Sequence, residues 1–178
     1  MNNEYTALEN LDIENFKYTN FKFNKKYKQL LSNIFYNKKY IVIETPPVSL
    51  FKQKNKKKEY ILYFHINNEL FIFLNKFDKY IQSILDKQYT YKSPLRKYNK
   101  KNYIKIQVPI NNGNLDIKIY DDKSNEININ FKKLSQEKII LILLLKHLGC
   151  SNNIIEPQWK LKGIIKNNIV DFDIFQLL

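Results

Sequence analysis

The stretch EYILYFHINNELFIFLNKFDKYIQSILDK, residues 59–87, changes its hydrophobic period part-way along. Residues 59–66 are mostly β-branched or aromatic and predict a strand, which the Asn67-Asn68 pair ends. From Leu70 the apolar residues recur at three- and four-residue spacing, which is typical of an amphipathic helix over 70–87. The first turns of this helix are also compatible with a longer strand. A strand joined directly to a single helix is therefore the centre of the predicted fold.

Further strands are predicted before this pair. Residues 16–23 alternate aromatic and polar side chains, and residues 39–45 are β-branched and apolar until Pro46-Pro47 ends them. Residues 52–58, KQKNKKK, contain no apolar anchor and are predicted to form a basic loop. The strands at 39–45 and 59–66 would then pair as a hairpin across that loop.

After the helix, residues 88–102 are predicted to form a loop rich in Tyr, Lys and Arg. Short strands follow at 103–108, 115–120, 127–131 and 158–165, with Asn112-Gly113 as a two-residue hairpin turn and 121–125 as a second turn. The apolar run in 136–148 suits a capped helix or a fully buried strand, and the neighbouring strands favour a strand.

This order of elements predicts a mainly β fold. Short strands with one α-helix inserted between the third and fourth favour a small closed or half-closed β-barrel. With 178 residues the chain suits a single domain with its own core. We expect an acidic mobile tail over 1–15, the folded domain over 16–166, and an acidic-aromatic tip over 167–178.

The composition argues against an enzyme. The single cysteine, Cys150, cannot form an intramolecular disulfide and suggests a reducing compartment. Two histidines and one cysteine do not make a Cys/His zinc site, and His65 lies in an apolar strand, where a core position is expected. Three glycines cannot supply a Gly-rich phosphate loop. The acids at 121–126 could hold a cation, although a solvated turn is favoured. We therefore predict no catalysis, no cofactor and no metal.

The N-terminus shows no targeting signal. Its first ten residues, MNNEYTALEN, lack the basic start and apolar core of a secretory signal. The longest apolar run, Ile139–Leu145, is far shorter than the ~20 residues of a membrane helix. The expectation is a soluble, intracellular protein without a membrane partner.

The positive charge is concentrated in the first half of the chain. Residues 1–16 have a net charge of −4, whereas residues 17–105 hold 21 basic and 5 acidic residues. Residues 106–178 have a net charge of only +1, within a total of +13. A field of this size attracts polyanions, although a lysine-rich solvated surface is the plainer explanation.

Tyrosine and lysine alternate in the same region, as in Tyr89-Thr90-Tyr91-Lys92 and Lys100-Lys101-Asn102-Tyr103. Single-stranded nucleic acid needs both residue types, because cations follow the phosphates and aromatic rings stack on unpaired bases. Arg96 is the only arginine, which argues against bidentate reading of guanine in a duplex. The candidate contacts are Lys38, Lys39, Tyr40, Lys56, Lys57, Lys58, Tyr89, Tyr91, Lys92, Arg96, Lys97, Tyr98, Lys100, Lys101, Tyr103, Lys105, Trp159, Lys160 and Lys162.

Each aromatic residue in this set has a structural alternative. A tyrosine on a strand can pair with a cross-strand neighbour or enter the core. Trp159 can be a stacking platform or a core residue, since lone tryptophans are largely buried. The sequence leaves these alternatives open for every single ring.

Four short pieces, in this order, resemble one family. They are Ile41-Val42-Ile43-Glu44-Thr45-Pro46, Phe77-Asp78 leading to Ile81, Tyr91-Lys92-Ser93-Pro94, and Trp159-Lys160-Leu161-Lys162. The chain resembles the OB-fold single-stranded DNA-binding proteins of large cytoplasmic DNA viruses and linear cytoplasmic plasmids. The resemblance implies an OB-type barrel that coats and protects single-stranded DNA during replication in the host cytoplasm, without catalysis.

The C-terminal tip departs from the resembled family, whose tails are acid-rich and end on an aromatic residue. Here Asp171, Phe172, Asp173 and Phe175 are followed by Gln176-Leu177-Leu178. These four residues could form an autoinhibitory tail, a hook for replication proteins, or an ordinary terminal strand or helix. Two other functions stay open: an accessory subunit of a replication, transcription or mRNA-capping complex, and a basic protein that condenses duplex DNA. The sequence also leaves open whether the chain forms a homo-oligomer.

Overall fold

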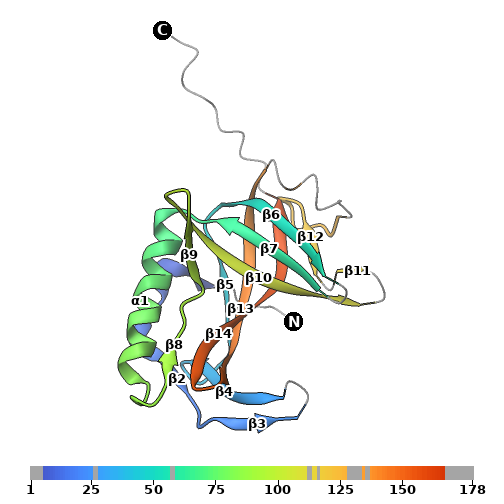
Figure 1. Ribbon diagram of the computed structural model, residues 1–178. Coiled ribbons are helices and arrows are strands. Elements are labelled where there is room, and N and C mark those ends of the chain that lie inside the picture. The colour runs from blue at the N-terminus through green and yellow to red at the C-terminus, as the bar shows by residue number, and fades with distance from the viewer. Residues whose placement is uncertain are drawn as a thin grey trace.

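The computed structural model describes residues 6–25, 28–56, 59–111, 114–115, 117–127, 134 and 137–166. Within them, one α-helix lies beside a curled and largely antiparallel sheet (Figure 1). The strands are β1 (Thr6–Ala7), β2 (Phe16–Tyr18), β3 (Lys22–Asn24), β4 (Gln29–Tyr36), β5 (Ile41–Glu44), β6 (Val48–Lys56), β7 (Glu59–His65), β8 (Thr90–Tyr91), β9 (Leu95–Tyr98), β10 (Lys101–Asn111), β11 (Asn114–Leu115), β12 (Lys118–Tyr120), β13 (Lys138–Ser151) and β14 (Ile154–Lys166). The helix is α1 (Asn68–Ile84), and two short 3-10 helices, η1 (Leu8–Asn10) and η2 (Ile13–Asn15), precede β2. The predicted mainly β class with one helix is confirmed, but the helix follows the seventh strand of the chain and not the third, because several short strands precede it.

Helix α1 begins where the sequence changes period. The Asn67 side chain accepts a hydrogen bond from the Leu70 amide at 3.0 Å, which satisfies one of the free N–H groups of the first turn. Glu69 adds a favourable negative charge to that turn. Leu70, Phe73, Leu74, Phe77 and Ile81 are the apolar residues buried by the helix, as the three- and four-residue spacing predicts. The predicted helix is therefore confirmed.

Strand β13 is the centre of the sheet. One of its edges pairs with β14 in an antiparallel hairpin, and its other edge meets β6, β5 and β4 in turn. From β6 the antiparallel path continues through β7 and β10 to β9. Because α1 lies between β7 and β10 in the chain, the helix connects two strands that are neighbours in the sheet. In Figure 1, β6, β7 and β10 pass in front of β13 and β14.

The sheet does not close into a barrel, which corrects the expected closed form. The second edge of β14 pairs with β8 at one end and with β12 at the other, both in parallel. Strand β10 does not pair with β14 among the described residues, so the sheet stays open between these two strands. The strongly curled sheet still encloses one core, with α1 against one side (Figure 1).

The apolar run before Cys150 is a strand, which confirms the favoured alternative for 136–148. Residues 138–151 form β13, and its side chains Leu141, Leu143 and Leu145 are almost fully buried. Ile142, on the opposite face of the strand, is also buried. A strand covered on both faces needs no polar alternation, which explains the unbroken apolar run.

Two expectations before the helix are wrong. Residues 52–56 are part of strand β6 rather than a basic loop, and β6 pairs with β7 over its length. The lysines at 52 and 54 are exposed whereas Leu50 is buried, because a register shift between Leu50 and Lys52 puts these two residues on opposite faces of the sheet. The predicted hairpin between 39–45 and 59–66 is also wrong, because β5 pairs with β1 and β13, whereas β7 pairs with β6 and β10. Strand β4, which was not predicted, pairs with β13 through residues 30–33.

Residues 6–15 belong to the folded body, which corrects the expected mobile tail over that part of 1–15. Strand β1 pairs in parallel with β5, and Leu8 is only 6% exposed. The carboxylate of Asp12 accepts a hydrogen bond from the Glu14 amide and so caps η2.

The remaining turns and strands agree in part with the predictions from the sequence. Asn111 and Asn114 pair across the Asn112-Gly113 position, as expected of a two-residue hairpin, and Asp121 accepts amide hydrogen bonds in the 121–125 turn. Residues 88–102 contain two short strands, β8 and β9, rather than only a loop. Of the strand predicted at 127–131, residues 128–131 lie outside the described residues, as does the tip at 167–178.

Candidate nucleic-acid interface

Strands β6, β7 and β10 turn one set of side chains away from the core. Leu62, Phe64, Ile104 and Ile106 point inward and are buried. The alternate residues carry rings and ammonium groups instead. We call this set the aromatic-lysine face; it consists of Phe51, Lys52, Lys54, Tyr63, His65, Lys101, Tyr103 and Lys105.

The strand register brings these residues together. Tyr63 of β7 lies between Lys52 of β6 and Lys105 of β10. His65 lies opposite Tyr103 on β10, one step further along. Residues directly opposite one another in an antiparallel pair project from the same side of the sheet, so rings and cations alternate across three strands.

A register shift in β6 adds Phe51 to this face. The shift lies between Leu50 and Lys52, so Phe51 is the extra residue of a bulge. Its ring stacks on the His65 imidazole, with centroids 3.8 Å apart and an interplanar angle of 15°. The Phe51 ring also lies 5.5 Å from Tyr103 and 6.2 Å from Tyr63, which is itself 6.0 Å from Tyr103. The four rings form one half-buried cluster on the outside of the sheet.

The ammonium groups around the rings are free for a ligand. Lys52 Nζ lies 5.8 Å from the centre of the Tyr63 ring, a cation–π distance. Lys52, Lys54, Lys101 and Lys105 are exposed, and among the described residues none of them has a carboxylate partner. Burial lowers the pKa of His65 below 6.5, and the positive charge of Lys101 lowers it further. The imidazole is therefore neutral at neutral pH.

The exposed part of this face has definite limits. Towards the far end of β7 the face reaches Ile61, which is only 2% exposed and so cannot contact a ligand. At the other end, Tyr98 of the edge strand β9 lies opposite Lys101 and is 59% exposed. The usable surface thus extends from the Phe51 and Tyr63 rings to Tyr98.

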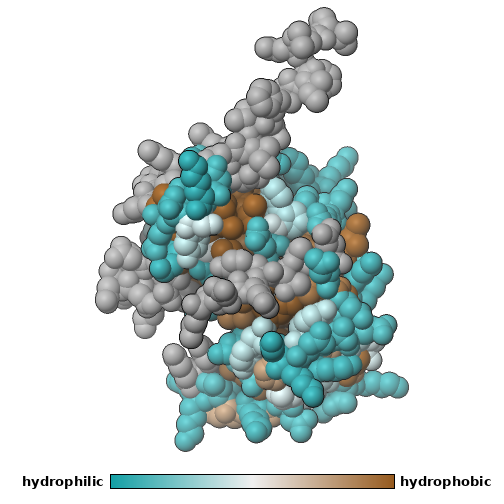
Figure 2. Space-filling model, turned by 180° about the vertical axis from the view of Figure 1, so that it is seen from behind, coloured by the Kyte–Doolittle hydropathy of each residue, from teal (hydrophilic) through white to brown (hydrophobic). Residues whose placement is uncertain are grey.

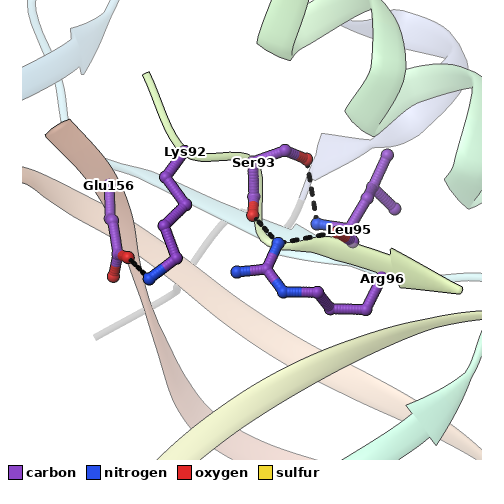
Figure 3. A network of polar contacts seen from close by, with 5 residues as sticks. All are labelled: Lys92, Ser93, Leu95, Arg96 and Glu156. Carbon is purple, nitrogen blue, oxygen red and sulfur yellow. Dashed lines mark hydrogen bonds and ion pairs between the residues drawn. The ribbon is translucent and has the colours of Figure 1, made fainter. Parts of the chain in front are cut away.

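A polar network holds the chain segment that leads into β9 (Figure 3). Ser93 Oγ accepts a hydrogen bond from the Leu95 amide at 3.0 Å and donates one to the buried carboxylate of Asp78 on α1. Tyr91 donates a second hydrogen bond to Asp78, at 2.5 Å. Arg96 donates to the Ser93 and Leu95 carbonyl oxygens. These contacts tie β9 to the helix and orient the edge of the aromatic-lysine face.

Several predicted contact residues do lie on or beside this face. Tyr98, Lys101, Tyr103 and Lys105 share it, and Arg96 is in register with Tyr103 although its guanidinium turns back to its own chain. Lys97 is opposite Asn102, on the other side of β9, and the exposed Lys100 lies in the turn before β10. Lys56 ends β6, with its side chain outside the description, and Lys57 and Lys58 lie outside the described residues.

Three predicted stacking rings are packed against the core. Tyr89 contacts Phe21 at 5.4 Å, and burial together with nearby Asp78 raises the pKa of Tyr91. The Trp159 ring lies 5.9 Å from Phe77 on α1. These three rings pack against the hydrophobic core. The prediction that they contact nucleic acid is therefore corrected: they are packing residues.

The other predicted residues lie elsewhere. Lys92 forms an ion pair with Glu156 (Figure 3). Lys38, Lys39 and Tyr40 lie at the β4–β5 turn, while Lys160 and Lys162 are exposed on β14. Strands β4, β5 and β14 do not pair with β6, β7 or β10 among the described residues, so these side chains are not sheet neighbours of the aromatic-lysine face. The single trough expected from residues 38–105 is thus not formed.

Five of the eight residues of the aromatic-lysine face are not among the predicted contacts. Phe51, Lys52 and Lys54 were assigned to or beside a loop, and Tyr63 and His65 to an ordinary strand. The period-two alternation of Tyr63 with His65 and of Lys52 with Lys54 was the available signal. His65, expected in the core, is half-exposed on the outer face instead.

Comparison with protein-family models and with curated proteins gives no match for this chain. Among the described side chains, no group of three or more His, Cys, Asp or Glu residues could hold a metal ion. The one helix in the described part of the chain is too short and too polar to cross a membrane.

Proposed function

We propose that this protein binds single-stranded DNA, without sequence preference and without catalysis, through the aromatic-lysine face. The observation that supports this most directly is the half-buried cluster of four rings beside four exposed lysines that have no carboxylate partner among the described residues. Each base stacked on an aromatic ring contributes roughly 1–3 kcal/mol, whichever base it is. Lysines beside the rings supply the phosphate attraction that such stacking needs.

A sheet face is a suitable platform for unpaired bases. Open antiparallel sheets that present aromatic rings are a known means of stacking two or three bases. The bulge at Phe51 and the neutral His65 place a flat stacked pair beside Tyr103. The proposal needs only this open surface. The viral or plasmid relationship that the resemblance implies, and a half-closed OB-type arrangement of the open sheet, remain proposals that this function does not require.

The duplex-condensing alternative has less support. Condensation of a duplex needs only cations that neutralise its phosphates, so the four clustered rings would have no role in it, because paired bases are not free to stack on them. The accessory-subunit alternative would use the same apolar rings as a protein contact. A protein contact through these rings would not require the exposed lysines of the aromatic-lysine face.

The test is a fluorescence titration with poly-dT and with duplex DNA at several salt concentrations. We expect poly-dT to bind more tightly than the duplex and to quench tyrosine emission. Tyr103→Ala should lower poly-dT affinity by about 10-fold, which corresponds to one lost stacking contact. Phe23→Ala is the matched control, because Phe23 is 64% exposed on β3 and lies outside the face. Equal binding of duplex and poly-dT, or loss of affinity in the control alone, would refute the proposal.

A further inference from the structure

A second group of rings and lysines lies at the β4–β5 turn. Tyr36 and Lys39 exchange backbone hydrogen bonds of 2.8 and 3.0 Å, which closes a two-residue turn. Asn37 and Lys38 take positive φ values of 48° and 65°, as such a tight hairpin turn requires. The turn holds Lys38 and Lys39 out in solvent.

Two aromatic rings pack together next to this turn. The Phe35 and Tyr40 rings have centroids 4.9 Å apart and are inclined by 33°. Tyr40 is 43% exposed, which is unusual for a ring in a paired cluster. Lys146 of β13 places its Nζ 5.3 Å from the centre of the Tyr40 ring. We call Phe35, Lys38, Lys39, Tyr40 and Lys146 the turn patch.

The turn patch is on the outer side of the β13 layer. Ile41, next to Tyr40, is buried in the core opposite Leu145, so Tyr40 and Lys146 project the other way. Figure 2 shows this molecule from behind, with hydrophilic side chains over much of the described surface and apolar ones between them.

Lysines outnumber carboxylates on the side of the sheet that carries Tyr40, although the exposed Asp12 and Glu14 lie close to the same turn, where the Asn37 amide donates to the Asn15 carbonyl. Lys160 of β14 lies opposite Leu144, whose other neighbour, Val42, is two residues from Tyr40. The Lys160 ammonium group therefore lies on the same side of the sheet as Tyr40. Glu44 is the carboxylate that shares this side along β5, and Glu156 is already held by Lys92. An exposed ring with several lysines again suits a phosphate chain with unpaired bases.

We propose that the turn patch is a second contact for the same DNA strand, which a strand reaches only after it has filled the aromatic-lysine face. This inference rests on the proposed function and adds to it a bipartite site. A short strand would contact only the aromatic-lysine face, whereas a longer one would extend around the sheet to the turn patch. Residues of both surfaces come from the strongly basic region 17–105, with Lys146 and Lys160 added by the sheet pairing.

The test compares two oligothymidylates, of about 8 and about 40 nucleotides, the shorter within the length that one such surface covers. Tyr40→Ala should weaken binding of the long strand by about 5-fold, at the lower end of the stacking range, and leave the short strand unchanged. Lys146→Gln, on an exposed side chain, should weaken the long strand without any effect on folding. Lys79→Gln, on the outer side of α1, is the matched charge control.

Each outcome is informative. Loss confined to the long strand supports the bipartite site. Unchanged long-strand affinity in both variants would overturn it, as would equal losses on both strands, since the turn patch would then be the first contact. The proposed function fails by a different result, namely that Tyr103→Ala leaves short-strand affinity unchanged.

Discussion

At the scale of single residues, rings and ammonium groups have separable effects on binding. A stacked ring contributes energy that depends little on salt, whereas a lysine that replaces a counterion changes the salt dependence. Tyr103 and Lys105 are two positions apart on one strand and share one face, so they form a natural pair for comparison.

For this pair we predict two distinct changes in poly-dT binding. Tyr103→Ala should lower affinity at every salt concentration and leave the slope of log K against log salt unchanged. Lys105→Ala should make that slope shallower by about 0.7, as expected for one lost phosphate contact to a single strand. Fluorescence titrations at four or more salt concentrations measure both values. A changed slope in Tyr103→Ala would argue that the ring only supports a nearby lysine.

His65 predicts a dependence on pH. Its pKa lies below 6.5 because burial and Lys101 disfavour the charged form. A polyanion favours the protonated imidazole, so affinity should rise as pH falls from above 6.5 through that lowered pKa. His65→Gln should abolish the rise, whereas His147→Gln, which removes a histidine outside the face, should keep it. A pH profile that is unaffected by His65→Gln would remove the imidazole from the site.

The lowered pKa of His65 also affects the stability of the fold, which should fall as pH falls, whereas the affinity for DNA should rise. A histidine whose pKa is lower in the folded state stabilises the fold above its unfolded pKa, and this contribution is lost as pH falls through the folded pKa. A fall in pH should thus raise the affinity for DNA and lower the free energy of unfolding of the DNA-free protein. Bound DNA should offset this loss of stability.

At the scale of elements, helix α1 and strand β9 are joined by the Asp78 network. Asp78 is only 5% exposed and accepts hydrogen bonds from Tyr91 and Ser93. Burial raises its pKa, and the two hydrogen bonds partly oppose that change. The role of the buried Asp78 carboxylate is thus to accept two hydrogen bonds, which hold the segment before β9 in place.

We predict that Asp78→Ala lowers the free energy of unfolding by about 2–4 kcal/mol, because two buried hydroxyl groups lose their acceptor. Asp78→Asn should cost less, since its amide can still bond to one or both hydroxyls. Urea unfolding measures these values. Amide hydrogen exchange at Leu95 should also become faster in Asp78→Ala. Unchanged exchange there would show that β9 is held by β10 alone.

At the scale of the whole molecule, the number of lysines on the aromatic-lysine face limits the salt dependence. Four ammonium groups predict a slope no steeper than about −3 for a short single strand, at roughly −0.7 for each phosphate. The net charge of +13 alone would predict a much larger value if all cations acted together. A short-strand slope well beyond −3 would contradict a site restricted to this face. A longer strand should give a steeper slope if it also reaches the turn patch.

Several features were predictable because they are local. The spacing from Leu70 to Ile81 specifies a helix, and Asn67 caps it, whatever the rest of the chain does. The apolar run of β13 and the Asn112-Gly113 turn are local in the same sense. The surplus of lysine in 17–105 and its alternation with tyrosine could be read directly from the sequence.

The sequence by itself thus determined the mainly β class, helix α1 and the polyanion-attracting charge. Only the tertiary structure decided which rings face solvent: Trp159 and Tyr91 pack beside α1, whereas Tyr63 and Tyr103 lie on the open face. The physical reason is that the exposure of a strand residue depends on register and on the layer packed against it, and both are set by distant segments. The bulge that brings Phe51 onto His65 has the same non-local origin.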